Sequence, residues 1–168
     1  MLETWDDKIF KFLAKHDRRR RIMDRDGIAP YLERGYLLWN SDGKDTKDRN
    51  AEQEGKKIKR MKDYFNVFIH RFLQSDVRGL FHTHPWPFIT IILRHGYWEH
   101  TPDGQRTWYG PGSIIFRKAS DMHWVELPQN KHPVTLFIHF KRVDTWAFLH
   151  GKELIQHNEY LKNYRGKK

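Results

Sequence analysis

The sequence contains no cysteine among its 168 residues. This absence excludes disulfide frameworks, thiolate zinc sites, cysteine nucleophiles and iron–sulfur clusters. Long apolar runs are also missing, since the longest covers residues 88–93 and is far too short to span a membrane. The first residues include Glu3 and Lys8, where a signal peptide has an apolar stretch. We therefore expect a cytoplasmic protein without membrane contact, in which any metal is bound by histidine, carboxylate or water.

Histidine, aromatic side chains and positive charge are abundant instead. The chain has 11 His, and its 31 Lys and Arg against 21 Asp and Glu give a net charge of +10. Aromatic residues make up 15% of the sequence, which argues against disorder, and the length suits one hydrophobic core. The charge favours an anionic partner. It is spread along the whole chain, which is not typical of a dedicated nucleic-acid surface.

The N-terminal segment has helical periodicity. Within residues 2–15, Trp5, Ile9 and Leu13 recur with Phe12 at helical spacing, which predicts a short amphipathic helix. A basic run at residues 18–21 follows, and we interpret it as a solvated helix end. Residues 40–63 are almost without apolar side chains. We expect them to form a long polar excursion, in which residues 51–61 are a candidate polar helix.

The remainder has the pattern of short β-strands. Segments rich in β-branched and aromatic residues alternate with Gly, Pro, Asp and Asn, which is typical of a sandwich or barrel. The predicted strands are residues 31–39, 64–73, 81–84, 88–100, 107–109, 113–116, 123–127 and 134–143. The sequence thus predicts an all-β fold made of an N-terminal helical segment (1–27), a β-barrel (28–148) and a short helical tail packed on the barrel (149–168).

His82 and His84 form the most informative pattern of the sequence. Residues two apart on a strand point to the same side, so the two imidazoles can converge on one point. Neutral imidazole is a ligand for Fe, Zn, Ni or Mn, and a third ligand must then come from another strand. The alternative is a pair of hydrogen-bonded histidines in an aromatic-rich β segment.

The surroundings of this pair resemble the first motif of the cupin family, G(X)5HXH(X)3,4E(X)6G. His82 and His84 match the two histidines, and Gly96 matches the final glycine. Ile89 occupies the position of the glutamate, and Gly79 lies too close to His82 to be the leading glycine. The resemblance therefore preserves the histidines and lacks the carboxylate.

Residues 112–127 resemble the second cupin motif, G(X)5PXG(X)2H(X)3N. Gly112 matches the opening glycine and His123 matches the histidine. Lys118, Ser120 and Leu127 replace the proline, the second glycine and the asparagine. Residues 31–148 as a whole look similar to uncharacterised bacterial and phage cupin-like proteins.

The resemblance implies a cupin-type double-stranded β-helix, or jelly-roll barrel, with a metal held by His82, His84 and His123. A site of three histidines leaves open positions for water, oxygen or substrate, as in thiol dioxygenase-like cupins. Glu99 is a candidate substitute ligand or general base. We slightly favour the simpler interpretation that Glu99 is a solvent-facing strand residue.

Further candidates lie elsewhere in the predicted barrel. Arg71 can clamp a substrate carboxylate or phosphate, or form a surface ion pair with Asp76 or Glu99. His139 is a candidate acid, base or partner of a metal ligand, with a structural histidine as the more ordinary interpretation. Three aromatic residues are candidates for the substrate pocket, although such rings are usually core: Trp86, Tyr97 and Trp124.

The leading functional hypothesis is a metal-dependent enzyme that acts on a small anionic molecule. Dioxygenase chemistry with Fe is favoured over isomerase or hydrolase chemistry, and Zn, Ni and Mn are the other metals considered. The first alternative is a non-catalytic module that binds nucleic acid through residues 18–21 and the basic residues of 56–62. The second is a metal-free protein similar to sugar-nucleotide epimerases, with His82 or His84 as base and Arg71 as clamp. A homodimer formed through an outer sheet face is a further expectation.

Overall fold

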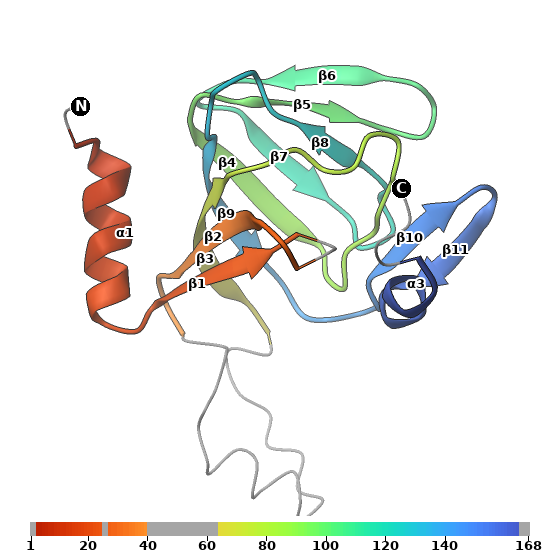
Figure 1. Ribbon diagram of the computed structural model, residues 1–168, viewed down its shortest axis with the longest axis horizontal. Coiled ribbons are helices and arrows are strands. Elements are labelled where there is room, and N and C mark those ends of the chain that lie inside the picture. Colours follow the sequence, from red (N-terminus) through yellow and green to blue (C-terminus); the bar gives the residue numbers. More distant parts are fainter. Residues whose placement is uncertain (1–2, 25–26, 40–63, 165–168) are drawn as a thin grey trace, which may run out of the picture.

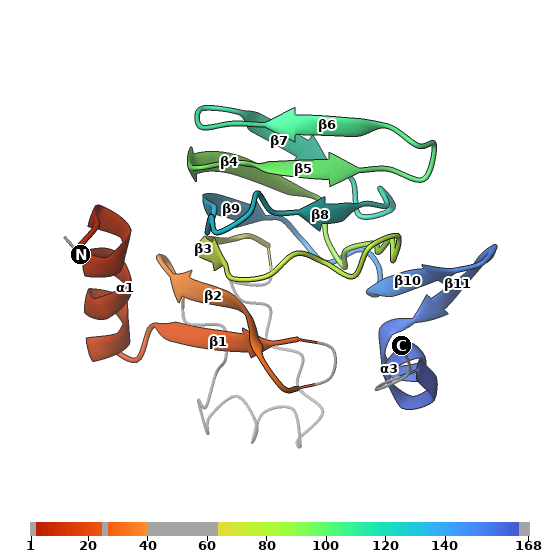
Figure 2. The same cartoon turned by 45° about the horizontal axis from the view of Figure 1, so that its top comes forward.

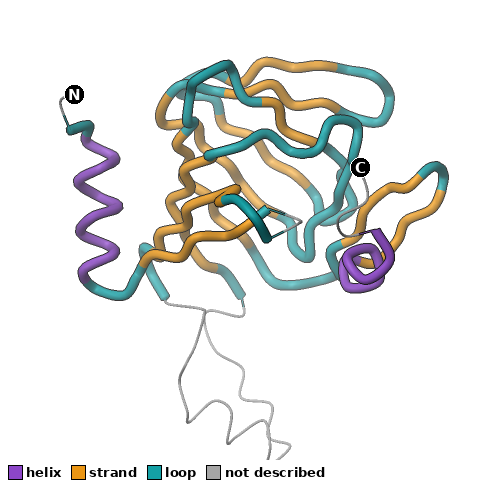
Figure 3. The backbone as a smooth tube through the Cα atoms, viewed as in Figure 1, coloured by secondary structure: helices purple, strands orange, loops and turns teal. Residues whose placement is uncertain are grey.

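The computed structural model describes residues 3–24, 27–39 and 64–164 (Figures 1 and 3). The predicted polar excursion, its candidate helix and the basic residues of 56–62 lie outside these ranges. The elements are α1 (Trp5–Lys15), β1 (Arg19–Met23), β2 (Pro30–Tyr36), β3 (Asn66–Phe72), β4 (Phe88–Arg94), β5 (Tyr97–His100), β6 (Arg106–Tyr109), β7 (Ile114–Arg117), β8 (Trp124–Glu126), β9 (Val134–His139), β10 (Ala147–His150), β11 (Glu153–Gln156) and α3 (His157–Tyr164).

Two sheets form the barrel (Figure 2). One has the order β1-β2-β3-β9-β4-β7 and the other the order β6-β5-β8. A β-bridge between His82 and His123 adds the segment around His82 beside β8. From β3 onward the chain passes back and forth between the sheets, except that β5 and β6 pair as a hairpin. The strands β3-β9-β4-β7 opposite the His82 segment, β8, β5 and β6 make the eight-stranded jelly roll of cupins, so the predicted fold class is confirmed.

The helix α1 covers the outer face of the larger sheet beside β1 and β2 (Figure 1). Phe10 and Leu13 pack there against Ile69 and Val134. The close contact needs a glycine at Gly35, because a Cβ atom at this position would lie 2.4 Å from a methyl carbon of Leu13. The outer face of β2 is therefore shaped to receive the helix.

The predicted apolar face of this helix is partly wrong. Trp5 and Phe12 are 45% and 61% exposed, whereas Asp6 is buried. The acidic side chain takes a core-facing position because Arg71 and Arg94 bind its carboxylate from the sheet. Apolar periodicity alone could not reveal this ionic contact.

The basic run is also corrected, because residues 19–23 form the edge strand β1 rather than a helix end. Within the run, Arg18 donates from Nε to the backbone oxygen of Tyr36 at 2.7 Å. Arg21 donates to Glu33 across the strand pair at 3.2 Å. These two arginines thus join the segment of β1 to β2. The sequence pattern alone did not predict these contacts.

Two other predicted boundaries differ from the structure. The segment 88–100 is two strands, because His95 and Gly96 turn the chain with φ angles of 67° and 110°. The C-terminal tail contains the hairpin β10–β11 before the short helix α3. Its residue Phe148 bridges His82, so the tail is tied to the histidine segment. Within the described residues, no helix has the length and apolar character needed to cross a membrane.

Candidate metal centre

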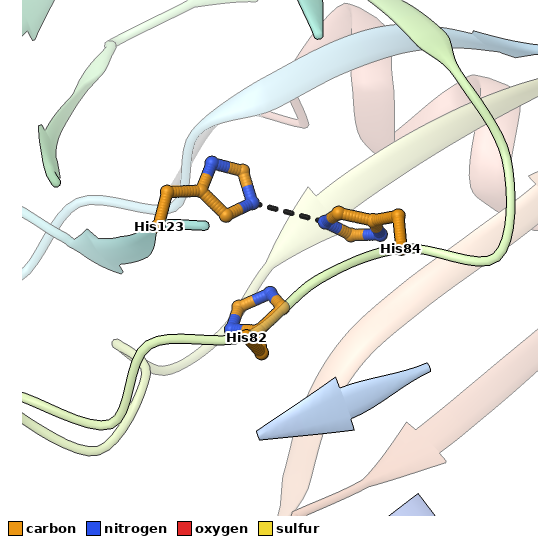
Figure 4. Close-up of side chains that lie close together, drawn as sticks. All are labelled: His82, His84 and His123. Carbon is orange, nitrogen blue, oxygen red and sulfur yellow. Dashed lines mark hydrogen bonds between the residues drawn. The ribbon is translucent and has the colours of Figure 1, made fainter. Parts of the chain in front are cut away.

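Three histidines from two separate segments converge between the sheets (Figure 4). His82, His84 and His123 each offer a ring nitrogen, and these nitrogens lie within 4.8 Å of one another. The backbone explains the convergence, because His82 and His123 exchange N–H···O bonds of 3.0 and 3.2 Å. His84, two residues further, is fixed by a bond from its N–H to Ala119 at 3.1 Å. The expected convergence of the three side chains is therefore present.

The electrostatic surroundings keep two of these rings neutral. Burial lowers the pKa of His82 to about 4 and holds the pKa of His84 well below its usual range. Both rings are therefore neutral near pH 7, the form in which imidazole binds a metal. Three converging imidazoles form a candidate metal site, and within the described residues they are the one cluster of this kind.

Glu99 orients the third ring from behind. Its carboxylate accepts a hydrogen bond from Nδ1 of His123 at 2.7 Å, and Arg117 binds its other oxygen. Because a carboxylate only accepts, His123 carries a proton on Nδ1 and directs Nε2 toward His84 and the centre. Burial alone would raise the pKa of Glu99, but the bonds from His123 and Arg117 outweigh it and lower that pKa.

This placement corrects the favoured interpretation of Glu99. The residue is 2% exposed and does not face solvent. It is also not one of the convergent ligand groups, because it contacts the outer nitrogen of His123. The buried carboxylate behind a ligand histidine is the partner that fixes the tautomer and raises the basicity of the ring.

The geometry fits a metal ion. Nε2 of His84 lies 2.9 Å from Nε2 of His123. Two nitrogens bound at right angles to one ion at about 2.1 Å are about 3.0 Å apart. The two nitrogens form a hydrogen bond in the structure (Figure 4), and two neighbouring metal ligands would have the same spacing. All three side chains are nitrogen donors that suit Fe, Zn, Ni or Mn.

Near the position of the missing cupin glutamate, the interior residue is Phe88 rather than Ile89. Burial alternates along β4, with Phe88, Thr90 and Ile92 directed to the interior and Ile89 to the outer face. The ring of Phe88 lies 4.6 Å from that of His84. The motif spacing that ends at Gly96 aligns Ile89 with the glutamate, but the interior residue beside the histidines is Phe88, so an apolar ring borders them.

Arg71 lies on the other face of the sheet from the centre. Its guanidinium binds Glu33 at 2.5 Å and Asp7 at 2.6 Å, and it stacks over Phe10 of α1. The adjacent residue His70 points to the interior and stacks on Phe137. The structure therefore does not bring Arg71 to the histidines, and its ion-pair partners are not the Asp76 and Glu99 expected from the sequence.

The remaining candidates divide between the interior and the outer face. His139 is interior, donates from Nδ1 to the backbone oxygen of Phe140 and lies 4.5 Å from the ring of Trp86. Tyr97 is core, packed with Ile92, Ile115 and Val125. Trp124 stacks on His100 at 3.7 Å on the outer face of the smaller sheet, opposite to His123. Of the three pocket candidates, Trp86 is the one that contacts an interior histidine, His139, within the described residues.

Sequence reasoning missed Arg34, the partner of His70. They lie directly opposite each other on β2 and β3, and Nε of Arg34 donates to Nε2 of His70 at 3.0 Å. Alternation along residues 31–39 could have placed Leu32, Arg34 and Tyr36 on one face. The pairing register that directs this face to the interior is a tertiary property.

Comparison with solved structures gives weak similarities. The chain is 17% identical to a cupin-like protein from Thermotoga maritima (TM-score 0.47, covering 81% of this chain and 86% of that one). It is 18% identical to the polyketide cyclase RemF from Streptomyces resistomycificus (TM-score 0.47, 73% and 75%). It is 11% identical to the Fe(II) form of HppE (TM-score 0.48, 74% and 57%). No protein-family profile and no curated sequence matches the chain. The fold is therefore assigned from the strand order of the chain itself.

Proposed function

We propose that this chain, with its cupin-type barrel, is a metal-dependent enzyme that oxidises a small organic anion with dioxygen. The observation that carries the proposal is the buried convergence of His82, His84 and His123, with Glu99 behind one ring. Iron is the metal we propose first, ahead of Zn, Ni and Mn. A divalent transition metal held by three imidazoles keeps open positions and supplies Lewis-acid or redox chemistry there.

The protein residues around the centre have separate roles in this proposal. His82 and His84 provide neutral donors, because burial keeps their pKa values low. Glu99 holds the proton of His123 on Nδ1 and so keeps Nε2 available. Phe88 borders His84 and excludes water from one side of the site. Substrate binds in the aromatic interior next to these rings.

A second candidate function is favoured by the same Glu99–His123 pair. A histidine whose Nδ1 is bonded to a buried carboxylate is the arrangement of a general base. Without metal, His123 accepts a proton from a substrate through Nε2, in place of His82 or His84, the bases expected in the epimerase-like alternative. Metal content separates the two candidates.

The test is elemental analysis of the purified protein together with its thermal stability. We expect about one transition-metal ion per chain and a lower melting temperature after chelation. His84→Ala should lose the metal, whereas His132→Ala should keep it, because His132 is exposed and bonds only to the backbone of Phe72 in the described structure. Oxygen uptake with small carboxylic acids, measured on the iron-loaded protein, then tests the reaction class.

Two results would overturn the proposal. The first is the absence of stoichiometric metal together with an unchanged melting temperature on chelation. The second is equal metal content in His84→Ala and His132→Ala, since the histidine cluster would then not be the binding site.

A further inference from the structure

We infer that Arg117 is a positioning residue of the metal centre, which orients the ring of His123 by holding the carboxylate of Glu99. The inference rests on the proposed function, because it assigns a role in that centre to a side chain outside the three histidines. Arg117 is the last residue of β7 in the larger sheet, whereas Glu99 belongs to β5 in the smaller one (Figure 2). Their contact therefore ties the centre to both sheets.

The pairing register directs Arg117 to the interior. Its cross-strand partner on β4 is Phe88, and directly paired residues project from the same face of a sheet. Phe88 is buried, and its ring lies 4.6 Å from that of His84. The alternation along β7 agrees, because Ile115 belongs to the buried core and Phe116 is exposed. Arg117 therefore enters the barrel beside the histidines.

Arg117 binds one oxygen of the carboxylate and leaves the other to the histidine. Its Nε donates to Oε1 of Glu99 at 3.1 Å, and its Nη2 donates to the same oxygen. Oε2 accepts the Nδ1–H of His123 at 2.7 Å. The guanidinium is itself fixed, because Nη2 also donates to the hydroxyl of Tyr109 at 3.1 Å and Nη1 to the backbone oxygen of Phe116 at 3.0 Å. A continuous set of hydrogen bonds thus runs from β7 to the ring of His123.

Burial makes the orientation of Glu99 depend on Arg117. The side chains of Arg117 and Glu99 are 22% and 2% exposed. A buried carboxylate that loses its cation is left uncompensated, and turning toward water then becomes favourable. A carboxylate that has turned away no longer fixes the tautomer and orientation of the ring. Removal of Arg117 should therefore loosen His123 without a change at His123 itself.

The outer face of the smaller sheet carries the same three residue types. His100 bonds Glu126 at 2.7 Å, and Arg106 bonds the same carboxylate at 3.2 Å. The side chains of Arg106 and Glu126 are 47% and 37% exposed. Ion pairs exposed to this degree contribute little. The one convergent ligand cluster within the described residues does not include His100. The outer set is therefore a matched control that has the same chemistry without the burial.

The first test is the affinity of the whole chain for Co²⁺, measured by competition with a chromogenic chelator, together with the visible absorption spectrum of the bound ion. Arg117→Met should lower the affinity about tenfold and change the spectrum, because the ring of one nitrogen donor is no longer held. Arg106→Met removes the same charge and should leave both unchanged. Arg117→Lys keeps the charge and loses the planar fork, so we expect an intermediate affinity in a folded protein even if Arg117→Met does not fold.

A double-variant cycle tests whether Arg117 acts through Glu99. When an amide replaces the carboxylate, little of the contribution of Arg117 is left to remove. We therefore expect the Glu99→Gln, Arg117→Met double variant to lose less affinity than the product of the two single fold-losses. A loss equal to that product would show that Arg117 acts independently of Glu99 and would overturn the inference.

A third measurement needs no metal. In the metal-free protein, the Nδ1–H of His123 should give a proton resonance that exchanges slowly with water, because a buried carboxylate accepts it. The resonance is assigned through its loss in His123→Ala. Arg117→Met should remove it through faster exchange, whereas Arg106→Met should keep it. A merely structural role of Arg117 would lower the melting temperature and leave the resonance in place.

The outcomes separate this inference from the proposed function. Loss of the Nδ1–H resonance in Arg117→Met, in a protein without stoichiometric metal, would support the positioning of His123 and overturn the metal-dependent function. Stoichiometric metal in the wild type with unchanged Co²⁺ affinity in Arg117→Met, or in Arg117→Lys if only that variant folds, would overturn the inference and leave the metal site. Equal losses of affinity in Arg117→Met and Arg106→Met would also overturn it.

Discussion

Arg71 and Arg34 lie on opposite faces of the β2–β3 strand pair, and their Nε atoms are bonded to different kinds of side chain. Outside, Arg71 is bound by the carboxylates of Glu33, Asp6 and Asp7, and these contacts join α1 to the sheet. Inside, Nε of Arg34 is bound by the neutral imidazole of His70. The outer cation is bound by three carboxylates of the chain, whereas Nε of the inner one donates to an imidazole.

The outer contacts have a structural role. A buried ion pair with several hydrogen bonds fixes two elements in one orientation, and loss of one partner leaves the others uncompensated. The same two strands dock the N-terminal helix with the outer face and place Arg34 and His70 on the inner face.

The largest expected effect is that of Arg71→Met. Asp6 and Glu33 are buried and would lose a bonded cation, so the free energy of unfolding should fall by about 3–5 kcal/mol. Arg106→Met should cost about 1 kcal/mol or less, because its ion pair with Glu126 is exposed. Urea unfolding measures both, with the exposed Arg142→Met as control. Equal losses for Arg71→Met and Arg106→Met would contradict the structural role of the buried ionic contacts of Arg71.

A second expected effect compares two glutamates of the smaller sheet. Glu99→Gln should lower metal affinity about tenfold to hundredfold, because the amide fixes the tautomer of His123 less strongly than the carboxylate. Glu126→Gln is the matched control, since Glu126 also bonds a histidine, His100 at 2.7 Å, but lies on the outer face. Competition with a chromogenic chelator measures both affinities. Similar losses in the two variants would show that the interior position of Glu99 is unimportant.

A third expected effect concerns the docking of α1. Gly35→Ala would place a methyl group 2.4 Å from a carbon of Leu13 and 2.7 Å from one of Ile69. We expect a loss of about 1–2 kcal/mol from this overpacking. The double variant with Leu13→Ala should lose less than the sum of the two single variants, because the smaller side chain relieves the clash. Additive losses would contradict the close contact of helix and sheet.

The fold and the centre of the site were predictable from the sequence for a simple physical reason. The spacing of His82 and His84, together with His123 in the second motif, depends on local alternation and on short connections. The strand segments also follow local alternation, with errors of a few residues at turns such as His95 and Gly96. Structure that is decided by neighbouring residues in the sequence can be predicted from such local patterns.

The other parts depend on contacts between distant segments. Asp6 is buried in α1 only because Arg71 and Arg94 meet it from the sheet. Glu99 faces inward because β5 pairs with both β6 and β8 in one register. Arg34 reaches the interior through its pairing with β3. No pattern within a single segment contains this information, which is why Arg71 was predicted as the clamp.

The smallest expected effect is the pH dependence of stability in the metal-free protein. Burial keeps the pKa of His70 well below its usual 6.5, so the folded state binds fewer protons than the unfolded chain below about pH 6.5. The stabilising contribution of neutral His70 is therefore complete above this pH and is lost as the pH falls below it. Hydrogen bonds from Thr4 and Arg71 lower the pKa of Asp7 from 3.8 to about 2, so the contribution of the outer contacts is lost only below about pH 4. Melting temperatures between about pH 8 and pH 3 should show the interior weakening first. His70→Phe should flatten the pH profile of the melting temperature near neutrality, and Asp7→Asn should flatten only its acid end. A change near neutrality in Asp7→Asn and at the acid end in His70→Phe would contradict the assignment of a neutral His70 to the inner face and an ionised Asp7 to the outer one.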